Sequence, residues 1–190
     1  MKPKLLHFWK EWVKPAVIVL AIMVPFRSSI ADWNVVPTGS MKPTIFEGDR
    51  IFVNKLAYDL KVPLTKQQVA SWGDPKVGDI VVCFSPADGK RLVKRVAGVP
   101  GDPIAWQQGM PFINEQPATY YPPARDALPD VVPDGQYFLL GDNRNNSADS
   151  RAFGFVAREQ IVGEATATVI SLDKTRWYKP RFDRFFQRLR

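Results

Sequence analysis

A serine in a short, stiffened segment is the first residue of this sequence that suits covalent chemistry. Ser40 lies in residues 37–44 (PTGSMKPT), between two prolines that restrict the backbone. Gly39 has no side chain, so it leaves room for a peptide to come close. A rigid, crowded serine is suited to act as a nucleophile. Taken alone, the segment also fits an ordinary polar turn before a strand.

A lysine within an apolar stretch could supply the base that such a serine needs. Lys94 lies in residues 91–102 (RLVKRVAGVPGD), and in a strand it would share a face with Leu92 and Val96. A free lysine has a pKa of about 10.4, and desolvation lowers it. A pKa of about 7 or 8 would make Lys94 a usable general base. The alternative is an edge-strand lysine that reaches water, a description that its neighbour Arg95 fits well.

A third segment, residues 141–151 (GDNRNNSADSR), follows an apolar stretch and is dense in hydroxyl and charged groups. Turn-forming residues account for part of this composition. A calcium-binding loop is excluded, because the segment lacks the central glycine and the closing glutamate of such loops. The remaining polar groups could orient a catalytic amine at the end of a strand.

Several other chemistries are excluded by composition. The chain has one cysteine, Cys83, and one histidine, His7, which lies beside the N-terminus. An internal disulfide and the usual zinc site therefore cannot form. The position of His7 also argues against Ser/His/Asp and Cys/His catalysis. We expect no metal and no cofactor.

The three segments, in this order and behind an apolar N-terminal stretch, resemble the type I signal peptidases. These are serine–lysine proteases that release secretory leader peptides. The resemblance extends from the apolar stretch to about residue 170 and includes residues 47–55 (EGDRIFVNK) and 78–86 (GDIVVCFSP). It implies a membrane-bound serine endopeptidase that removes N-terminal signal peptides from secreted preproteins, cleaving after small residues.

The resemblance also implies a role for individual residues. Ser40 would be the nucleophile and Lys94 the general base. The backbone N–H of Ser40 and the hydroxyl of Thr38 would form the oxyanion hole; many relatives have serine at the Thr38 position. The remaining implied roles are a hydrogen bond to the lysine from Ser147, a supporting ion pair of Asp149 and Arg151, and substrate pockets lined by Val36, Met41, Ile45 and Leu92.

The elements that must position these residues begin with an anchor. Residues 15–26 (PAVIVLAIMVPF) are uncharged and apolar, and residues 12–31 reach the length of about 20 that spans a bilayer. Basic residues precede the run, so the positive-inside rule places the N-terminus in the cytoplasm and the chain after Ala31 outside. Phe8, Trp9 and Trp12 are typical of an interfacial aromatic belt. The alternative is a secretory signal peptide that is removed; a buried core helix is disfavoured, since no flanking segment is a helical partner.

Charge is concentrated at the two ends of the chain. Residues 1–27 carry five basic residues and one acid, residues 174–190 carry seven and one, and the middle carries fourteen and seventeen. A nucleic-acid-binding protein would have its basic residues on the folded body, so we expect no nucleic-acid partner. Basic ends instead favour contact with an anionic membrane. In residues 173–190 they alternate with aromatic residues, which suits either an interfacial segment or a solvated, disordered tail.

The rest of the sequence indicates a mostly β fold, with an antiparallel sheet behind one transmembrane helix. We expect a cytoplasmic N-terminus and anchor in residues 1–31, a catalytic domain in 32–172 and a basic aromatic tail in 173–190. Residues 116–135 hold five prolines and read as irregular, which suggests a short accessory excursion at about 103–135. The expected strands are residues 50–57, 79–85, 91–97, 104–107, 111–114, 137–140 and 159–171, with a Gln-Gly hairpin turn between the fourth and fifth.

Three rival functions stay open on the sequence. One is a serine–lysine protease with a narrower task, such as pilin maturation. A second is a self-cleaving protein of the LexA-like kind, which normally carries a DNA-binding domain. The third is a tethered β module that binds extended peptides without cutting them. For the leading hypothesis the expected partners are preproteins, membrane lipid and the secretion translocon, and the expected location is the bacterial plasma membrane, with one span and the catalytic domain on its outer face.

Overall fold

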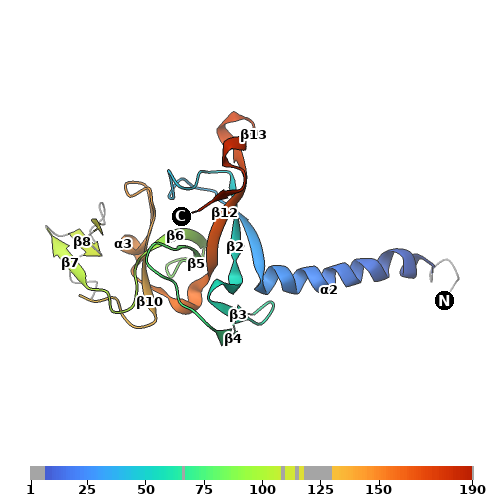
Figure 1. Cartoon of the computed structure of the whole chain (residues 1–190), viewed down its shortest axis with the longest axis horizontal. Coiled ribbons are helices and arrows are strands. Elements are labelled where there is room, and N and C mark those ends of the chain that lie inside the picture. Colours follow the sequence, from blue (N-terminus) through green and yellow to red (C-terminus); the bar gives the residue numbers. More distant parts are fainter. Residues whose placement is uncertain (1–6, 66, 108–109, 114–115, 118–129, 190) are drawn as a thin grey trace.

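A single helix projects from a curled, mostly antiparallel β body (Figure 1). The computed structural model describes residues 7–65, 67–107, 110–113, 116–117 and 130–189. This arrangement confirms the fold class predicted from the sequence. The first part of the predicted cytoplasmic segment, residues 1–6, lies outside the described residues.

The projecting helix has the length and composition of a membrane span. A π-helical turn, η1 (Trp9–Val13), continues directly into α2 (Lys14–Ser29), and the 21 residues from Trp9 to Ser29 are apolar enough to cross a bilayer. At 1.5 Å per residue they extend about 31 Å, close to the thickness of the hydrocarbon core. The helix lies two to three residues nearer the N-terminus than the predicted span of residues 12–31.

The helix ends where the ammonium group of Lys55 donates hydrogen bonds to two of its last carbonyl oxygens. Lys55 Nζ donates to the carbonyl oxygens of Arg27, at 2.8 Å, and Ser28, at 3.0 Å. Arg27 in turn pairs with Asp32 at 2.9 Å. These contacts allow the chain to enter strand β1 at Ala31, whereas the sequence analysis expected β structure only from residue 34.

The body is one sheet with the strand order β1-β2-β12-β5-β6-β10-β11. The long strand β12 lies in its middle, between β2 and β5. A hydrogen bond of 2.6 Å from Arg91 on β6 to Asn34 on β1 joins strands four places apart, which shows how strongly the sheet curls. The strands of this sheet are β1 (Ala31–Val35), β2 (Asp49–Asn54), β5 (Ile80–Phe84), β6 (Arg91–Gly98), β10 (Gln136–Leu140), β11 (Val156–Ala157) and β12 (Ile161–Asp173).

A second, small sheet forms the accessory excursion. It has the order β7-β8-β9 and lies at the end of the molecule opposite α2 (Figure 1). The predicted hairpin is present as β7 (Ile104–Gln107) and β8 (Met110–Ile113), followed by β9 (Gln116–Pro117). The predicted Gln108-Gly109 turn, Asn114 and residues 118–129 of the irregular stretch lie outside the described residues.

Several short elements were not predicted. One is the hairpin β3 (Asp59–Lys61) and β4 (Gln68–Ser71), which follows the 3-10 turn η2 (Lys55–Ala57). Residues 55–57, expected to extend a strand, form this turn because the Asn54 side chain accepts a hydrogen bond from Leu56 N–H. The others near the site are α3 (Ser150–Phe153) and the 3-10 turn η4 (Arg158–Gln160), where the sequence analysis had already begun the last long strand.

The basic aromatic tail folds back onto the sheet. Its elements are η5 (Lys174–Arg176), β13 (Lys179–Pro180), η6 (Phe182–Arg184) and β14 (Gln187–Arg188), and both strands pair with β12. Arg181 and Arg184 reach the fully buried carboxylate of Asp49, at 3.5 and 2.8 Å. A disordered tail is therefore wrong for the part that the structure describes, although aromatic side chains such as Trp177 and Phe186 stay exposed.

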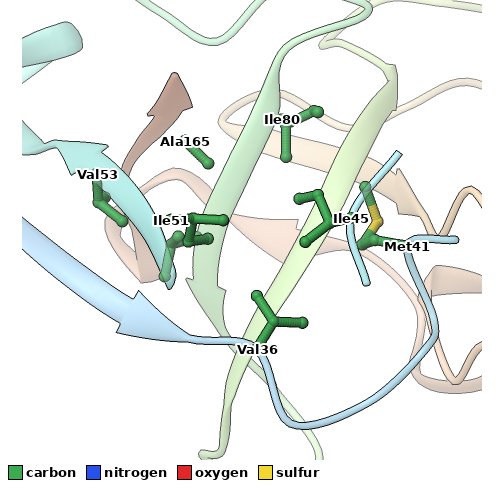
Figure 2. Close-up of a cluster of buried hydrophobic side chains, with 8 residues drawn as sticks. Val36, Met41, Ile45, Ile51, Val53, Ile80 and Ala165 are labelled. Atoms are coloured by element: carbon green, nitrogen blue, oxygen red, sulfur yellow. The ribbon is translucent and has the colours of Figure 1, made fainter. Parts of the chain in front are cut away.

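A buried apolar cluster fixes the loop that carries Ser40 (Figure 2). Met41 and Ile45, both from this loop, are fully buried. They contribute to the same cluster as residues from β2, β5 and β12, so the loop is held against the middle of the sheet. The members labelled in Figure 2 are Val36, Met41, Ile45, Ile51, Val53, Ile80 and Ala165.

Candidate active site

The structure brings Ser40 and Lys94 into direct contact. Ser40 lies in the turn that follows β1 and Lys94 lies on β6, and Lys94 Nζ is 2.9 Å from Ser40 Oγ. This is within hydrogen-bonding distance for a nucleophile and its base. A loop residue and a strand residue, 54 positions apart in the sequence, thus form one polar pair.

Burial lowers the pKa of the Lys94 amine. The residue is only 2% exposed, and its cross-strand partner is Val81. Leu92 and Val96 lie on the same side of β6 by strand alternation. Desolvation by these surroundings lowers the pKa of Lys94, while the carboxylate of Asp149 acts in the opposite direction. The net shift is downward, as the sequence analysis predicted.

A second hydroxyl and a buried ion pair surround the same amine. Ser147 Oγ is 3.0 Å from Lys94 Nζ. Asp149 pairs with Arg151 through contacts of 2.7 and 2.8 Å, with side-chain exposures of 0% and 1%. Burial alone would raise the pKa of Asp149, but hydrogen bonds from Arg151 and from Gly141 N–H bring it below its usual value. The lowered pKa favours the charged form of Asp149, and Arg151 offsets part of the attraction that this carboxylate exerts on the lysine proton.

The groups expected to form an oxyanion hole face open space beside the pair. Thr38 is exposed, and it lines the same groove as Ser40. Within the described part of the chain, neither the Thr38 hydroxyl nor the Ser40 backbone N–H has a hydrogen-bond partner. Both donors are thus available to a substrate carbonyl next to Ser40 Oγ.

A groove of about 520 Å³ passes over the serine–lysine pair. Three of the four residues expected to line substrate pockets contribute to it: Val36, Met41 and Leu92. Ile45 does not, because it is fully buried in the cluster of Figure 2 beneath the loop. The other lining residues are Asn34, Val35, Pro37, Thr38, Ser40, Lys90, Arg91, Val93, Lys94, Asn146 and Ala148.

Two residues that fix the serine loop were not singled out from the sequence. Asn143 donates from its backbone N–H to Ser40 O and from Nδ2 to Gly39 O, both at 3.0 Å. Gly141 has no room for a side chain, since a Cβ there would clash with Ser147 Oγ and the Ser40 carbonyl. Both lie in the polar segment 141–151, so the segment was recognised but the roles of these two members were not.

Arg95 is also part of this arrangement, contrary to the sequence analysis. It was expected to reach water, but it pairs with Asp142 through contacts of 2.8 and 2.7 Å. Asp142 also accepts a hydrogen bond of 2.6 Å from the Thr44 hydroxyl. Arg95 does not extend into water because it pairs with Asp142. The side chains of Arg95, Asp142 and Thr44 thus connect β6, the polar segment and the serine loop.

The other candidate nucleophile and base lie elsewhere. Burial raises the pKa of Cys83 to about 12, so its thiol stays protonated. His7 is exposed and lies at the far end of the helix. Among the described residues no group of three or more His, Cys, Asp or Glu side chains could hold a metal ion.

Comparison with known proteins shows the family. Residues 9–170 match the family model described as "Signal peptidase, peptidase S26". The chain belongs to this signal peptidase family. It is 36% identical to the probable signal peptidase I-2 of Synechocystis, over 83% of this chain and 71% of the relative. It is 33% identical to signal peptidase I P of Bacillus subtilis subsp. natto, over 89% of this chain and 93% of the relative.

A solved structure is also similar, that of a signal peptidase I from Enterococcus faecalis. It is 30% identical, matches 50% of this chain and 100% of that chain, and has a TM-score of 0.39. As a signal peptidase, the chain is a serine endopeptidase that removes signal peptides. Its N-terminal apolar helix is compatible with membrane association, which the same family suggests.

Proposed function

We propose that the chain is a membrane-anchored signal peptidase in which Ser40 is the nucleophile and Lys94 the general base. The observation that carries this proposal is the 2.9 Å contact between Lys94 Nζ and Ser40 Oγ, with Lys94 almost fully buried. Desolvation keeps the amine neutral in a pH range where a free lysine is charged. A neutral amine at this distance can accept the serine proton.

Cleavage proceeds in two halves at this pair. Neutral Lys94 takes the proton of Ser40 as Oγ bonds to the carbonyl carbon of the scissile peptide. The resulting ammonium then gives that proton to the leaving amine, and the C–N bond breaks. Water attacks the acyl-serine in the second half, with Lys94 again accepting and returning a proton. The hydroxyl of Ser147 and the Asp149–Arg151 pair hold the amine in place throughout.

Negative charge that develops on the carbonyl oxygen needs donors that are already oriented. The Ser40 N–H and the Thr38 hydroxyl supply them in this proposal, since both line the groove beside Ser40 Oγ. The hydrogen bonds from Asn143 to Gly39 and Ser40 hold the backbone between these donors. The serine loop therefore enters the reaction already in position.

Two free strand edges suit an extended peptide. β1 is the outer strand of the sheet, and β10 pairs with β6 only from Arg95 onward, which leaves residues 91–94 of β6 open on that side. A peptide between them would add to the sheet through backbone hydrogen bonds. Val36, Met41 and Leu92 line the groove there and make its wall apolar, and the preference for small residues before the cut is what the resemblance to the signal peptidases implies.

For location, we propose one span with the N-terminus in the cytoplasm and the body on the outer face of the plasma membrane. Lys10 and Lys14 at the start of the helix support this orientation, as the positive-inside rule requires. Lipid at that surface and the secretion translocon are the partners that a protease in this position would meet beside its preproteins.

The test is cleavage of a purified preprotein that has small residues at the cut site. Ser40→Ala and Lys94→Ala should each abolish cleavage and leave the fold intact, and the double variant should be no worse, because the two residues act as a unit. His7→Ala is the matched control and should keep full activity. Clear turnover by either single variant, or an inactive His7 variant, would overturn the serine–lysine assignment.

A further inference from the structure

Two adjoining hollows lie where the helix α2 meets the β body, away from the serine–lysine pair. The first, of about 380 Å³, is lined by residues of the helix end and of the sheet. The second, of about 470 Å³, runs along the last turns of α2. Ser29 and Lys61 line both, so one ligand could occupy the two together.

The first hollow is rich in cationic groups. Lys55, Lys61 and Arg91 line it, against one lining acid, the exposed Glu159. The two nearby buried acids are each shared between cations: Asp32 is 3.8 Å from Lys55 and 3.4 Å from Arg91, and Asp59 is 3.7 Å from Lys61 and 2.9 Å from Arg158. Burial lowers the pKa of Lys55, and the nearby cations Arg91, Arg27 and Lys61 lower it further against the pull of Asp32. An anion in this hollow would relieve that repulsion.

A buried hydroxyl adds a polar contact at the same place. Ser29 is 5% exposed, and its Oγ has no hydrogen-bond partner within the described part of the chain. Ser28 also lines the hollow. The hollow thus offers hydroxyl and ammonium donors together, a combination suited to phosphate oxygens.

The second hollow is apolar on both sides. Ala21, Ile22, Pro25 and Phe26 of α2 form one wall, and Leu60, Val62, Pro63 and Val69 of the hairpin β3–β4 line the other. A hydrogen bond of 2.7 Å from Leu64 N–H to Ser28 Oγ fixes the hairpin to the helix. The hairpin lies beside the part of α2 nearest the body (Figure 1). Apolar walls of this kind suit an acyl chain.

We propose that this junction binds one anionic phospholipid of the outer leaflet. Its phosphate lies among Lys55, Lys61 and Arg91, and one acyl chain lies between α2 and the hairpin. The inference rests on the membrane span proposed above, which puts residues 21–30 at the depth of the outer leaflet. A continuous site that is cationic at the helix end and apolar along the helix matches the two halves of such a lipid. Because Arg91 also lines the substrate groove, the lipid would lie next to an arriving signal peptide.

The test measures lipid retained by the full chain. The protein is reconstituted in nanodiscs of equal phosphatidylglycerol and phosphatidylcholine and released into mild detergent. The phospholipids that remain bound are then counted by native mass spectrometry. The unaltered chain should retain one phosphatidylglycerol in preference to phosphatidylcholine. Lys61→Gln should lower that preference about fivefold, while Lys61→Arg, which keeps the charge, should preserve it.

Matched controls separate the two halves of the site. Lys76→Gln removes an exposed lysine outside both hollows and should change nothing. Val69→Ser, in the second hollow, should reduce retention of both lipids. Val77→Ser, at a 48% exposed valine outside both hollows, should not. Equal effects of Lys61→Gln and Lys76→Gln would overturn the phosphate site.

Other outcomes identify a different occupant or a failed premise. Equal retention of the two lipids by the unaltered chain would overturn the proposal. A raised KM of Lys61→Gln for a preprotein in lipid-free detergent, with lipid retention unchanged, would assign the hollow to the substrate instead. A chain found in the soluble fraction with no lipid bound would overturn the proposal by removing the membrane span itself, while cleavage activity would still test the serine–lysine pair.

Discussion

At the scale of single residues, the proposed mechanism needs a lysine that loses its proton readily and stays within reach of Ser40. The same side chain must avoid water, which lowers its pKa, and still reach two hydroxyls at 2.9 and 3.0 Å. Asp149 would work against this by attracting the proton, and its pairing with Arg151 limits the effect. In the proposed mechanism the ion pair therefore supports the polar segment while Arg151 reduces the effect of Asp149 on the pKa of Lys94.

The pH dependence of cleavage should report this burial. The lowered pKa of Lys94 means that the folded protein releases the lysine proton at lower pH than a free lysine. Activity should be lost as pH falls through that pKa and be present above it. The acidic limb of kcat/KM against pH should thus lie well below the value of about 10.4 for free lysine. A limb near that value would show that Lys94 is not desolvated in the working enzyme.

Thr38 provides a test of the oxyanion hole. Thr38→Val keeps the branched shape and removes the hydroxyl, so kcat should fall about 100- to 1,000-fold with little change in KM. Thr38→Ser keeps the donor and should retain most activity. Steady-state kinetics on a preprotein separates the two parameters. An active valine variant would remove Thr38 from the proposed mechanism.

The sequence alone was enough to identify residues whose role follows from their type and their immediate neighbours. The lysine face of β6 follows from strand alternation, so the burial of Lys94 could be predicted. The roles of Asn143 and Gly141 could not be predicted, because they depend on how the polar segment packs against the serine loop, which is far away in the sequence. Arg95 was misjudged for the same reason, since its partner Asp142 lies in a distant part of the chain.

At the scale of elements, the tail acts on the loop that carries Ser40. Arg184 lies 4.4 Å from the centre of the Phe46 ring, and it donates to Thr44 O at 2.9 Å and to Asp49 at 2.8 Å. Arg181 approaches the same ring at 5.6 Å. Through Arg184, the turn η6 (Phe182–Arg184) therefore holds the serine loop at Thr44 and Phe46 as a clamp. The two-residue strands of the tail, β13 and β14, could not be predicted from local sequence patterns, because only their pairing with β12 defines them.

Removing this clamp should weaken both fold and turnover. Arg184→Met deletes the hydrogen bonds to Thr44 and to a fully buried carboxylate and should lower the free energy of unfolding by about 2 kcal/mol. It should lower kcat several-fold with KM nearly constant, since the loop positions the nucleophile. Urea unfolding and steady-state kinetics provide the two measurements.

The matched control for the clamp is Arg188→Met, which removes an exposed arginine of β14. Its effect on unfolding should stay within about 0.5 kcal/mol. If the two variants behaved alike, the clamp would have no specific role, and the tail would contribute only by covering β12.

At the scale of the whole molecule, the proposed membrane span would keep the nucleophile close to the membrane surface. Residues 32–39 separate the predicted end of the anchor from Ser40, and even fully extended they span less than about 30 Å. β1 uses part of that length inside the sheet, which shortens the reach further. A signal peptide held in the bilayer would present its end at the same height.

The chain should therefore stay in the membrane with its N-terminal helix attached. Intact-mass analysis of protein extracted from membranes should give the full chain, and protease added to the outer side should reach the body. A soluble chain that begins at Asp32 would instead identify the apolar helix as a removed signal peptide. That result would contradict the tethered arrangement and leave the serine–lysine chemistry untouched.

The central place of β12 has a consequence for when this enzyme becomes active. Ser40 lies in the loop between β1 and β2 and Lys94 belongs to the β5–β6 pair, and β12 is the strand that joins the two pairs within the sheet. During synthesis both pairs leave the ribosome well before β12 does. Before β12 arrives, no strand pairing joins β2 to β5 among the described residues. The order of synthesis therefore predicts that Ser40 and Lys94 reach their final arrangement only after most of the chain has been made.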